Sequence, residues 1–246
     1  GTMHGFCLDL LQTYIPETFK YGVLTDITQQ LLIDRETNKS GFNTAVKTVQ
    51  GVESSLRRYT DTPVFKGALS ILQEDAVDFG LVPPETTASL AKYKDFLADK
   101  RYFDYTSMMV EAVGFLERSQ TATILDTAEQ SLRDHVENDV KYVIVDEYQD
   151  VNPIQERLVA RLVHFGANLC VVGDDDQTIY QWRGSQVSNI VTFSERYAGV
   201  RKVTLADNFR SSKGVVELAR SVAERIPAGE RLSKTMVSAD TQSWER

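Results

Sequence analysis

Acidic and amide side chains gather at two places where an apolar run of the sequence ends. Asp146 and Glu147 come directly after the apolar run Tyr142–Val145, and Gln177 follows the apolar run 169–172 after a Gly-Asp turn. A carboxylate at such a position can hold a phosphate-bound Mg²⁺, and its neighbour can reach a water in line with a phosphorus atom. A neutral glutamine can hydrogen-bond a terminal phosphate without adding charge. A solvated acidic turn is the alternative, because short motifs often occur by chance.

Two further segments carry aromatic and basic side chains. Tyr180, Trp182 and Arg183 stand within four residues of one another, so their rings could stack on bases and the guanidinium could touch phosphates. Burial of both rings in a core is the alternative, because aromatic side chains favour burial. Phe209 and Arg210 follow a third apolar run. An arginine there can meet phosphate charge, and a surface arginine at a helix start is the alternative.

Apolar runs and helical stripes alternate along the second half of the chain. Residues 142–145, 169–172 and 200–205 are predicted to be strands, the first of them buried on both faces. Asn152 and Pro153 are typical of a helix start. The alternation predicts an α/β fold with a parallel sheet and right-handed crossovers. Ligands in such sheets bind at the carboxyl ends of the strands.

The first part of the chain has a different pattern. Residues from about 15 to 100 are mainly helical in pattern, without long β-branched runs. Asp26–Arg35 and residues 89–98 are predicted helices. The polar stretch 41–51 predicts a break between elements.

Composition sets limits on the class of protein. The 246 residues include 35 acids and 27 Lys and Arg, for a net charge of −8, and 42 % are hydrophobic. These values exclude a disordered tail, a collagen-like chain and a disulfide scaffold. The acidic balance argues against a nucleic-acid coat but allows a local basic groove. No apolar run approaches the roughly 18 residues that span a bilayer, so we expect no membrane partner. Two cysteines without a CxxC pattern predict a cytoplasmic setting.

In their order along the chain, these segments resemble the UvrD/Rep superfamily 1 DNA helicases. The resemblance covers about residues 141–226 and rests on the runs 145–150, 172–184 and 205–211. The opening segment from Thr2 to Cys7 is similar to the family's Thr-x-His-Ser-x-Cys motif, which touches single-stranded DNA.

The resemblance implies a role for each matched residue of the nucleotide site. Asp146 would hold Mg²⁺, and Glu147 would be the base that activates the attacking water. Gln177 would sense the γ-phosphate, and Arg210 would contact it as an arginine finger. Phe209 stands where the family usually has an adenine-stacking tyrosine.

The resemblance also implies contacts with DNA. Tyr180, Trp182 and Arg183 would lie where the family couples the nucleotide state to DNA, with Trp182 as a base-stacking platform. Thr2 and His4 would approach the DNA backbone. The expected partners are single-stranded DNA and junctions of single-stranded and duplex DNA.

The fold implied by the resemblance is a partial RecA-like parallel sheet of the P-loop NTPase type with an inserted helical subdomain. The motor part would take up residues 1–15 and 101–232, the insertion 16–100, and a linker 233–246. No GxxxxGK[ST] loop occurs in the 246 residues. Because that loop cradles the phosphates, we expect this chain alone to be inactive, as a fragment without the start of the first motor domain and without the second. An exposed apolar sheet edge then predicts self-association.

The expected function is therefore that of a fragment of an ATP-dependent 3′-to-5′ DNA helicase or translocase in repair, replication or recombination. ATP and Mg²⁺ would be bound by the full-length protein. Two alternatives stay open. The first is a DNA-binding or interaction protein that has lost the phosphate loop and does not hydrolyse ATP. The second is a Mg²⁺-dependent phosphatase or nuclease that uses Asp146, Glu147 and residues 174–176 as a two-metal cluster.

Overall fold

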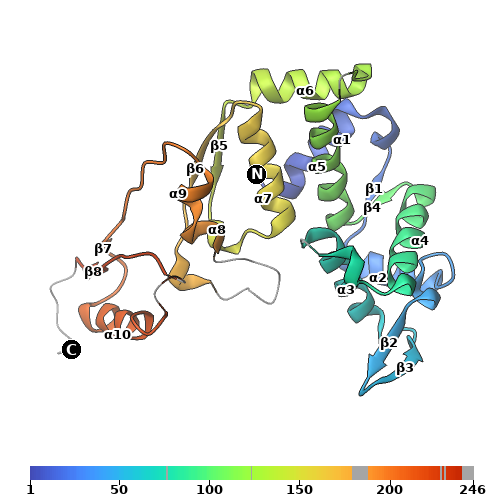
Figure 1. Ribbon diagram of the computed structural model, residues 1–246, viewed down its shortest axis with the longest axis horizontal. Coiled ribbons are helices and arrows are strands. Elements are labelled where there is room, and N and C mark those ends of the chain that lie inside the picture. Colours follow the sequence, from blue (N-terminus) through green and yellow to red (C-terminus); the bar gives the residue numbers. More distant parts are fainter. Residues whose placement is uncertain (76, 123, 179–187, 228, 230, 240–246) are drawn as a thin grey trace. The chain divides into compact units, whose positions relative to one another are not determined.

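The structure is a computed structural model that describes residues 1–75, 77–122, 124–178, 188–227, 229 and 231–239 (Figure 1). Contacts divide the chain into two units. The first unit comprises Gly1–Val143 and Asn152–Leu169, and the second comprises Ile144–Val151 and Cys170–Arg246. Strands β5 (Tyr142–Val145) and β6 (Asn168–Val171) run from the first unit into the second.

The first unit is mainly helical. Its remaining helices and strands are α1 (Met3–Tyr14), β1 (Gly22–Val23), α2 (Asp26–Arg35), β2 (Val46–Val49), β3 (Val52–Ser55), α3 (Thr62–Glu74), α4 (Pro84–Lys100), β4 (Tyr102–Phe103), α5 (Tyr105–Thr121), α6 (Thr127–Asp139) and α7 (Pro153–His164). The helix predicted over Asp26–Arg35 is confirmed, and the one predicted over 89–98 lies within α4.

One hydrophobic cluster of the first unit lies among α1, α5, α6 and α7. Cys7, Leu116, Leu132 and Ile154 have no exposed surface in it. Complete burial of such a side chain stabilises a fold by about 1.5–3 kcal/mol. Asn152 caps α7 by accepting the N–H of Gln155 at 3.1 Å, as its position before Pro153 predicts.

A second hydrophobic cluster lies within residues 24–97, among α2, α3 and α4. Ile33, Phe42, Phe65 and Tyr93 form its centre, and the rings of Phe42 and Phe65 meet edge to face. The stretch 41–51, predicted to be a break between elements, instead contains β2 and the turn of an antiparallel hairpin of β2 and β3. Its two-residue turn has positive φ at both Gln50 and Gly51. That turn type usually contains Asn-Gly or Asp-Gly, so Gln50-Gly51 is a weak indication of a hairpin.

The parallel strand pairs confirm the α/β class. β1 pairs with β4 in parallel, and β5 pairs with β6. The N–H of Asn168 donates to Lys141 O and the N–H of Val172 donates to Val145 O, both at 2.8 Å. The hydrogen bonds thus advance in the same direction along both strands, which is the parallel pattern.

The strand predicted over 142–145 is confirmed as β5, but it is not buried on both faces. Tyr142 and Ile144 are 77 % and 74 % exposed, whereas Val145 is buried. Among the described residues, β6 is the one strand that pairs with β5, so the outer face of β5 carries apolar side chains in contact with solvent.

The second unit contains short elements that follow β5 and β6. They are the 3₁₀ turns η4 (Tyr148–Asp150) and η5 (Asp175–Gln177), helices α8 (Ser188–Val191), α9 (Phe193–Arg196) and α10 (Lys213–Ala223), and strands β7 (Asp207–Asn208) and β8 (Val237–Ser238). β7 pairs in parallel with β8. The strand predicted over 200–205 is wrong: no described strand pairs with this stretch, and its Val203 and Leu205 are exposed.

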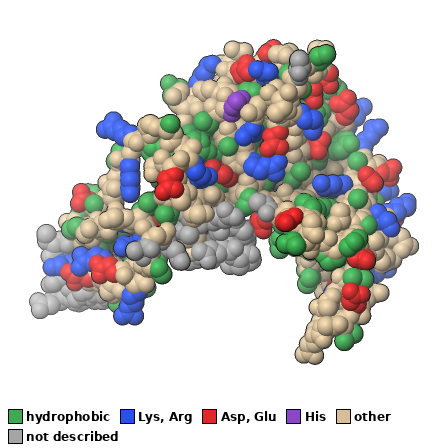
Figure 2. Space-filling model, in the orientation of Figure 1, with side chains coloured by type: hydrophobic (Ala, Val, Ile, Leu, Met, Phe, Trp, Pro, Cys, Tyr) green, Lys and Arg blue, Asp and Glu red, His purple; other side chains and the backbone are tan. Residues whose placement is uncertain are grey.

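In the described part of the chain, no helix combines the length and the apolar character that crossing a bilayer requires. Figure 2 shows Lys and Arg side chains interspersed with Asp and Glu side chains over the visible face.

Candidate functional site

The chain leaves β5 through a turn that holds Glu147 in the left-handed region, at φ 51°. A residue other than glycine rarely adopts this conformation, so its surroundings must hold it there. The fully buried Tyr148 donates its N–H to Val172 O at 3.0 Å, and the N–H of Asp150 donates to Glu147 O at 2.9 Å. Asp146 Oδ1 accepts the N–H of Glu147 at 3.0 Å. The turn thereby presents the carboxylates of Asp146 and Glu147 on the surface.

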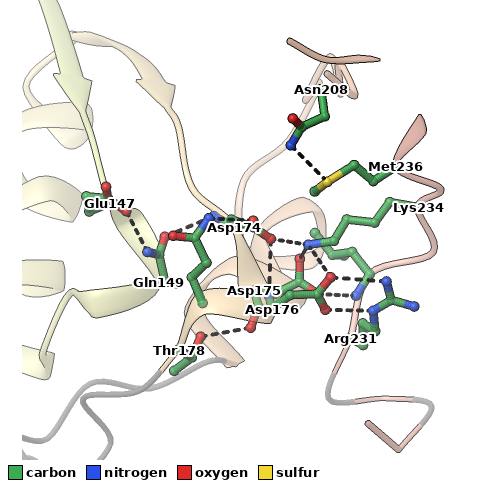
Figure 3. A network of polar contacts seen from close by, with 12 residues as sticks. Glu147, Gln149, Asp174, Asp175, Asp176, Thr178, Asn208, Arg231, Lys234 and Met236 are labelled. Carbon is green, nitrogen blue, oxygen red and sulfur yellow. Dashed lines mark hydrogen bonds and ion pairs between the residues drawn. The ribbon is translucent and has the colours of Figure 1, made fainter. Parts of the chain in front are cut away.

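Gln149 connects the two strand-end loops of the second unit. Its side chain is buried; Nε2 donates to Glu147 Oε2 at 2.7 Å, and Oε1 accepts the N–H of Asp174 at 3.0 Å (Figure 3). Gly173 lies tightly against this amide. A Cβ at Gly173 would stand 2.6 Å from Gln149 Oε1 and 2.8 Å from Ile190 Cδ1. Glycine is therefore required at position 173 for the two loops to approach each other.

Gln177 lies at the surface of the second loop, where Asp174 holds its side chain. Gln177 Nε2 donates to Asp174 Oδ2 at 2.7 Å. Burial raises the pKa of Asp174, but hydrogen bonds from Lys234 and Gln177 outweigh it and bring the pKa below the usual aspartate value. The amide oxygen of Gln177 has no described partner and can accept a hydrogen bond from a ligand or a water.

Residues 174–176 form an acidic loop, and two basic residues near the C-terminus, Arg231 and Lys234, bind it. Arg231 donates from Nε and Nη2 to the two carboxylate oxygens of Asp176, at 2.6 and 3.0 Å. Lys234 Nζ contacts Asp174, Asp175 Oδ1 at 2.5 Å and Asp176 Oδ2 at 3.3 Å (Figure 3). Burial lowers the pKa of Lys234, but these carboxylates outweigh it and raise the pKa above its usual range. No signal in the sequence near residue 176 predicted these partners.

A third loop carries Phe209 and Arg210. Asn208 Oδ1 accepts the backbone N–H of Arg210 at 3.0 Å and that of Ser211 at 2.8 Å, which shapes the turn. Phe209 is 84 % exposed. The guanidinium of Arg210 is also exposed and has no partner among the described residues. Both side chains are therefore free to meet a ligand.

The N-terminal candidates belong to the first unit. Thr2 caps α1 by accepting the N–H of Gly5 at 3.0 Å. The ring of His4 meets Tyr105 edge to face, with 5.5 Å between ring centroids. Burial lowers the pKa of His4, so the ring is neutral at pH 7. The other candidates for DNA contact, Tyr180, Trp182 and Arg183, lie outside the described residues.

The described residues offer a limited set of metal ligands. No group of three His, Cys, Asp or Glu in this part of the chain could hold a metal ion on its own. Mg²⁺ that is bound together with phosphates needs only one or two carboxylates, because waters and phosphate oxygens complete its octahedron. The exposed carboxylate of Asp146 is a hard oxygen donor of this kind. The residues present therefore fit a phosphate-bound Mg²⁺.

The parallel strand pair with polar loops at its carboxyl end defines an α/β protein, and proteins of this class bind ligands at the carboxyl ends of their strands. Residues 1–198 match the UvrD/REP helicase N-terminal domain family, and the chain belongs to this family. It is 30 % identical over 244 residues to the ATP-dependent DNA helicase PcrA of Staphylococcus epidermidis, and 30 % identical over 235 residues to the same-named protein of Staphylococcus aureus. Each alignment covers 93 % of this chain and 30 % of the relative. The resemblance noted from the motifs is confirmed.

Proposed function

We propose that this chain is part of a longer ATP-dependent DNA helicase or translocase that moves 3′ to 5′ along single-stranded DNA in repair, replication or recombination. The chain spans about a third of the length of the relatives it matches, and their names describe ATP-dependent DNA helicases. The observation that carries the proposal is the buried Gln149, which holds the loops of Glu147 and Gln177 together at the end of the sheet.

In this proposal the strand-end residues act on ATP. Asp146 holds Mg²⁺, which would neutralise charge on the phosphates. Glu147 is the general base, because Gln149 occupies only its Oε2 and leaves Oε1 to accept a proton from a water. Gln177 senses the γ-phosphate, and the exposed guanidinium of Arg210 stabilises its charge.

In this proposal, other residues contact the adenine and the DNA. The exposed ring of Phe209 stacks on adenine in place of the tyrosine that the family usually has. Thr2 and His4 approach the DNA backbone from the start of α1. Tyr180, Trp182 and Arg183 stack on bases and contact phosphates, with Trp182 as the platform. Single-stranded DNA and its junctions with duplex DNA are the proposed partners.

We also propose that the chain alone does not hydrolyse ATP, since its 246 residues contain no GxxxxGK[ST] loop. The second hydrophobic cluster supports an inserted subdomain over 16–100, because all its members fall within residues 24–97.

The exposed Tyr142 and Ile144 on β5 support self-association of the fragment, which light scattering at rising concentration would detect. Free Cys7 and an exposed, free Cys170 fit a cytoplasmic setting.

Two alternatives compete with this proposal. A DNA-binding protein that does not hydrolyse ATP would leave the geometry of Glu147 and Gln149 without a role. A two-metal phosphatase or nuclease needs free carboxylates on residues 174–176, yet Arg231 and Lys234 already pair with these aspartates. The ion pairs therefore disfavour the nuclease.

The test uses the longer product of the gene that encodes this chain. Glu147→Gln should lower DNA-stimulated ATP hydrolysis by about 10²-fold or more, since general-base catalysis contributes roughly 10²–10⁴-fold. Glu217→Gln is the matched control, because Glu217 lies on α10 with only a 3.8 Å contact to Lys213. Full activity of Glu147→Gln would contradict the role assigned to Glu147.

A further inference from the structure

The C-terminal segment 231–239, here called the clasp, contacts two of the loops described above. Through Arg231 and Lys234, one end of the clasp binds the acidic side chains of residues 174–176 (Figure 3). The other end pairs with β7, which ends two residues before Arg210. All these residues belong to the second unit. The clasp thus joins two loops that are more than 30 residues apart in the sequence.

At its first end the clasp is held by charge. Lys234 Nζ contacts all three carboxylates of residues 174–176, and the N–H of Leu232 donates to Asp175 Oδ2 at 2.7 Å. Asp174 uses its other oxygen, Oδ2, to accept from Gln177 Nε2. Asp174 therefore lies between the ammonium group of Lys234 and the amide of Gln177.

At its second end the clasp is held by the backbone. The N–H of Val237 donates to Ala206 O and that of Ala239 donates to Asn208 O, both at 2.9 Å. Asn208 Nδ2 also points to Met236 Sδ at 3.4 Å, while its Oδ1 holds the Arg210 N–H. Movement of the clasp would therefore move the turn that carries Arg210.

We propose that Lys234 is a positioning residue, which fixes the Gln177 amide through Asp174 and ties it through the clasp to the turn of Arg210. The roles of Gln177 and Arg210 toward phosphate rest here on the proposed function. Three unpaired aspartates beside a polyphosphate would repel it. Lys234 and Arg231 neutralise most of that charge, so the loop can carry a phosphate-sensing glutamine.

The proposal can be tested in the 246-residue chain by nuclear magnetic resonance without any nucleotide. Lys234→Met should shift both the side-chain amide signals of Gln177 and the backbone amide signal of Arg210. It should also speed hydrogen exchange of the Val237 and Ala239 amides by about tenfold or more, because the clasp opens locally. Lys234→Arg keeps the cation and should restore the signals. Lys213→Met, which removes a lysine with one exposed partner, is the control and should change none of them.

Asp174→Asn distinguishes the contact between Asp174 and Gln177 from the attachment of the clasp. It can be measured even if Lys234→Met unfolds the second unit. It should shift the Gln177 amide but leave exchange at Val237 and Ala239 slow, because Lys234 still contacts Asp175 and Asp176. An unchanged Gln177 amide in Asp174→Asn would overturn the proposal. So would a folded Lys234→Met that leaves the Arg210 signal in place. Either result would leave the ATPase proposal standing, since no nucleotide is present.

Discussion

The buried amide of Gln149 donates from Nε2 to Glu147 Oε2 over 2.7 Å, and this bond determines where the carboxylate of Glu147 can lie. The other end of the same amide accepts the N–H of Asp174. One side chain thus sets both the orientation of the proposed base and the spacing of the loop that holds Gln177.

Gln149→Ala should destabilise the second unit and weaken the proposed site. The change leaves the partly buried Asp174 N–H without its acceptor, which should cost about 1 kcal/mol, the lower end of the range for unsatisfied buried groups. Urea unfolding followed by signals of the second unit measures the loss. Gln130→Ala is the control, because the side chain of Gln130 makes one exposed hydrogen bond, to Asp134. Equal stability of the two variants would contradict the bridging role.

Gly173→Ala should separate the two strand-end loops. The added methyl group would stand 2.6 Å from Gln149 Oε1 and 3.2 Å from the backbone N of Tyr148, so the loops must move apart. Overpacking of this kind costs about 1–3 kcal/mol. Gly114→Ala on α5 is the control. A Cβ at Gly114 would have its nearest neighbour at 3.3 Å, in the flexible guanidinium group of Arg118. The side-chain amide signal of Gln149 should shift only in Gly173→Ala, and an unshifted signal would be evidence against the tight approach.

Asp174 should make the second unit sensitive to acid. Its pKa is below the usual value in the folded state, so its stabilising effect is present above its ordinary pKa of about 3.9 and is lost as the pH falls through the folded value. The difference in free energy of unfolding between the wild type and Asp174→Asn should therefore shrink on going from pH 7 to pH 3. A difference that does not depend on pH would show that Lys234 does not stabilise the charged form.

Glu74 should show the opposite dependence. Burial is the main cause that raises its pKa, although Thr106 and Asn152 donate hydrogen bonds to it. Its contribution is fully present below its ordinary pKa of about 4.3 and is lost as the pH rises through the folded value. Relative to Glu74→Gln, the wild type should lose stability between pH 4 and pH 7. Urea titrations of the first unit at both pH values test this sign.

Leu132→Ala tests the first hydrophobic cluster. The side chain has no exposed surface, and such a truncation costs about 2–5 kcal/mol through lost burial and the cavity that remains. The exposed Ile124→Ala should change the free energy of unfolding by less than about 0.5 kcal/mol. A small effect of Leu132→Ala would mean that α6 does not belong to this core.

Local features of the fold followed from the sequence because neighbouring residues encode them. The apolar run of β5 and the Asn152-Pro153 start of α7 lie where they were predicted. The strand predicted over 200–205 is absent from the described structure. An apolar run forms a strand only where another strand pairs with it, and a local pattern does not reveal that partner. The turn at Gln50 and Gly51 lacked the usual residues and was missed.

In the candidate site, too, residues marked by a local pattern could be predicted, whereas residues that act through distant contacts could not. Glu147 and Gln177 could be identified from the sequence because each lies within five residues after the end of an apolar run. Lys234 lies 60 residues after Asp174, and no local pattern indicates that the two meet. Gln149 belongs to the run 145–150, which carries the family resemblance. That it joins the loops of Glu147 and Asp174 depends on its burial and on the close approach of Gly173, and only the folded chain shows these. The roles of Trp182 and its neighbours stay predictions.

The rate of ATP hydrolysis by the longer gene product, measured with Mg²⁺ and with or without single-stranded DNA, tests the proposed helicase function most directly. The proposed helicase should hydrolyse ATP faster by at least about tenfold when single-stranded DNA is added, because its nucleotide and DNA sites are coupled. Cleavage of DNA or of a phosphate ester with Mg²⁺ alone, together with no ATP hydrolysis under any of these conditions, would contradict the proposal and favour the nuclease or phosphatase.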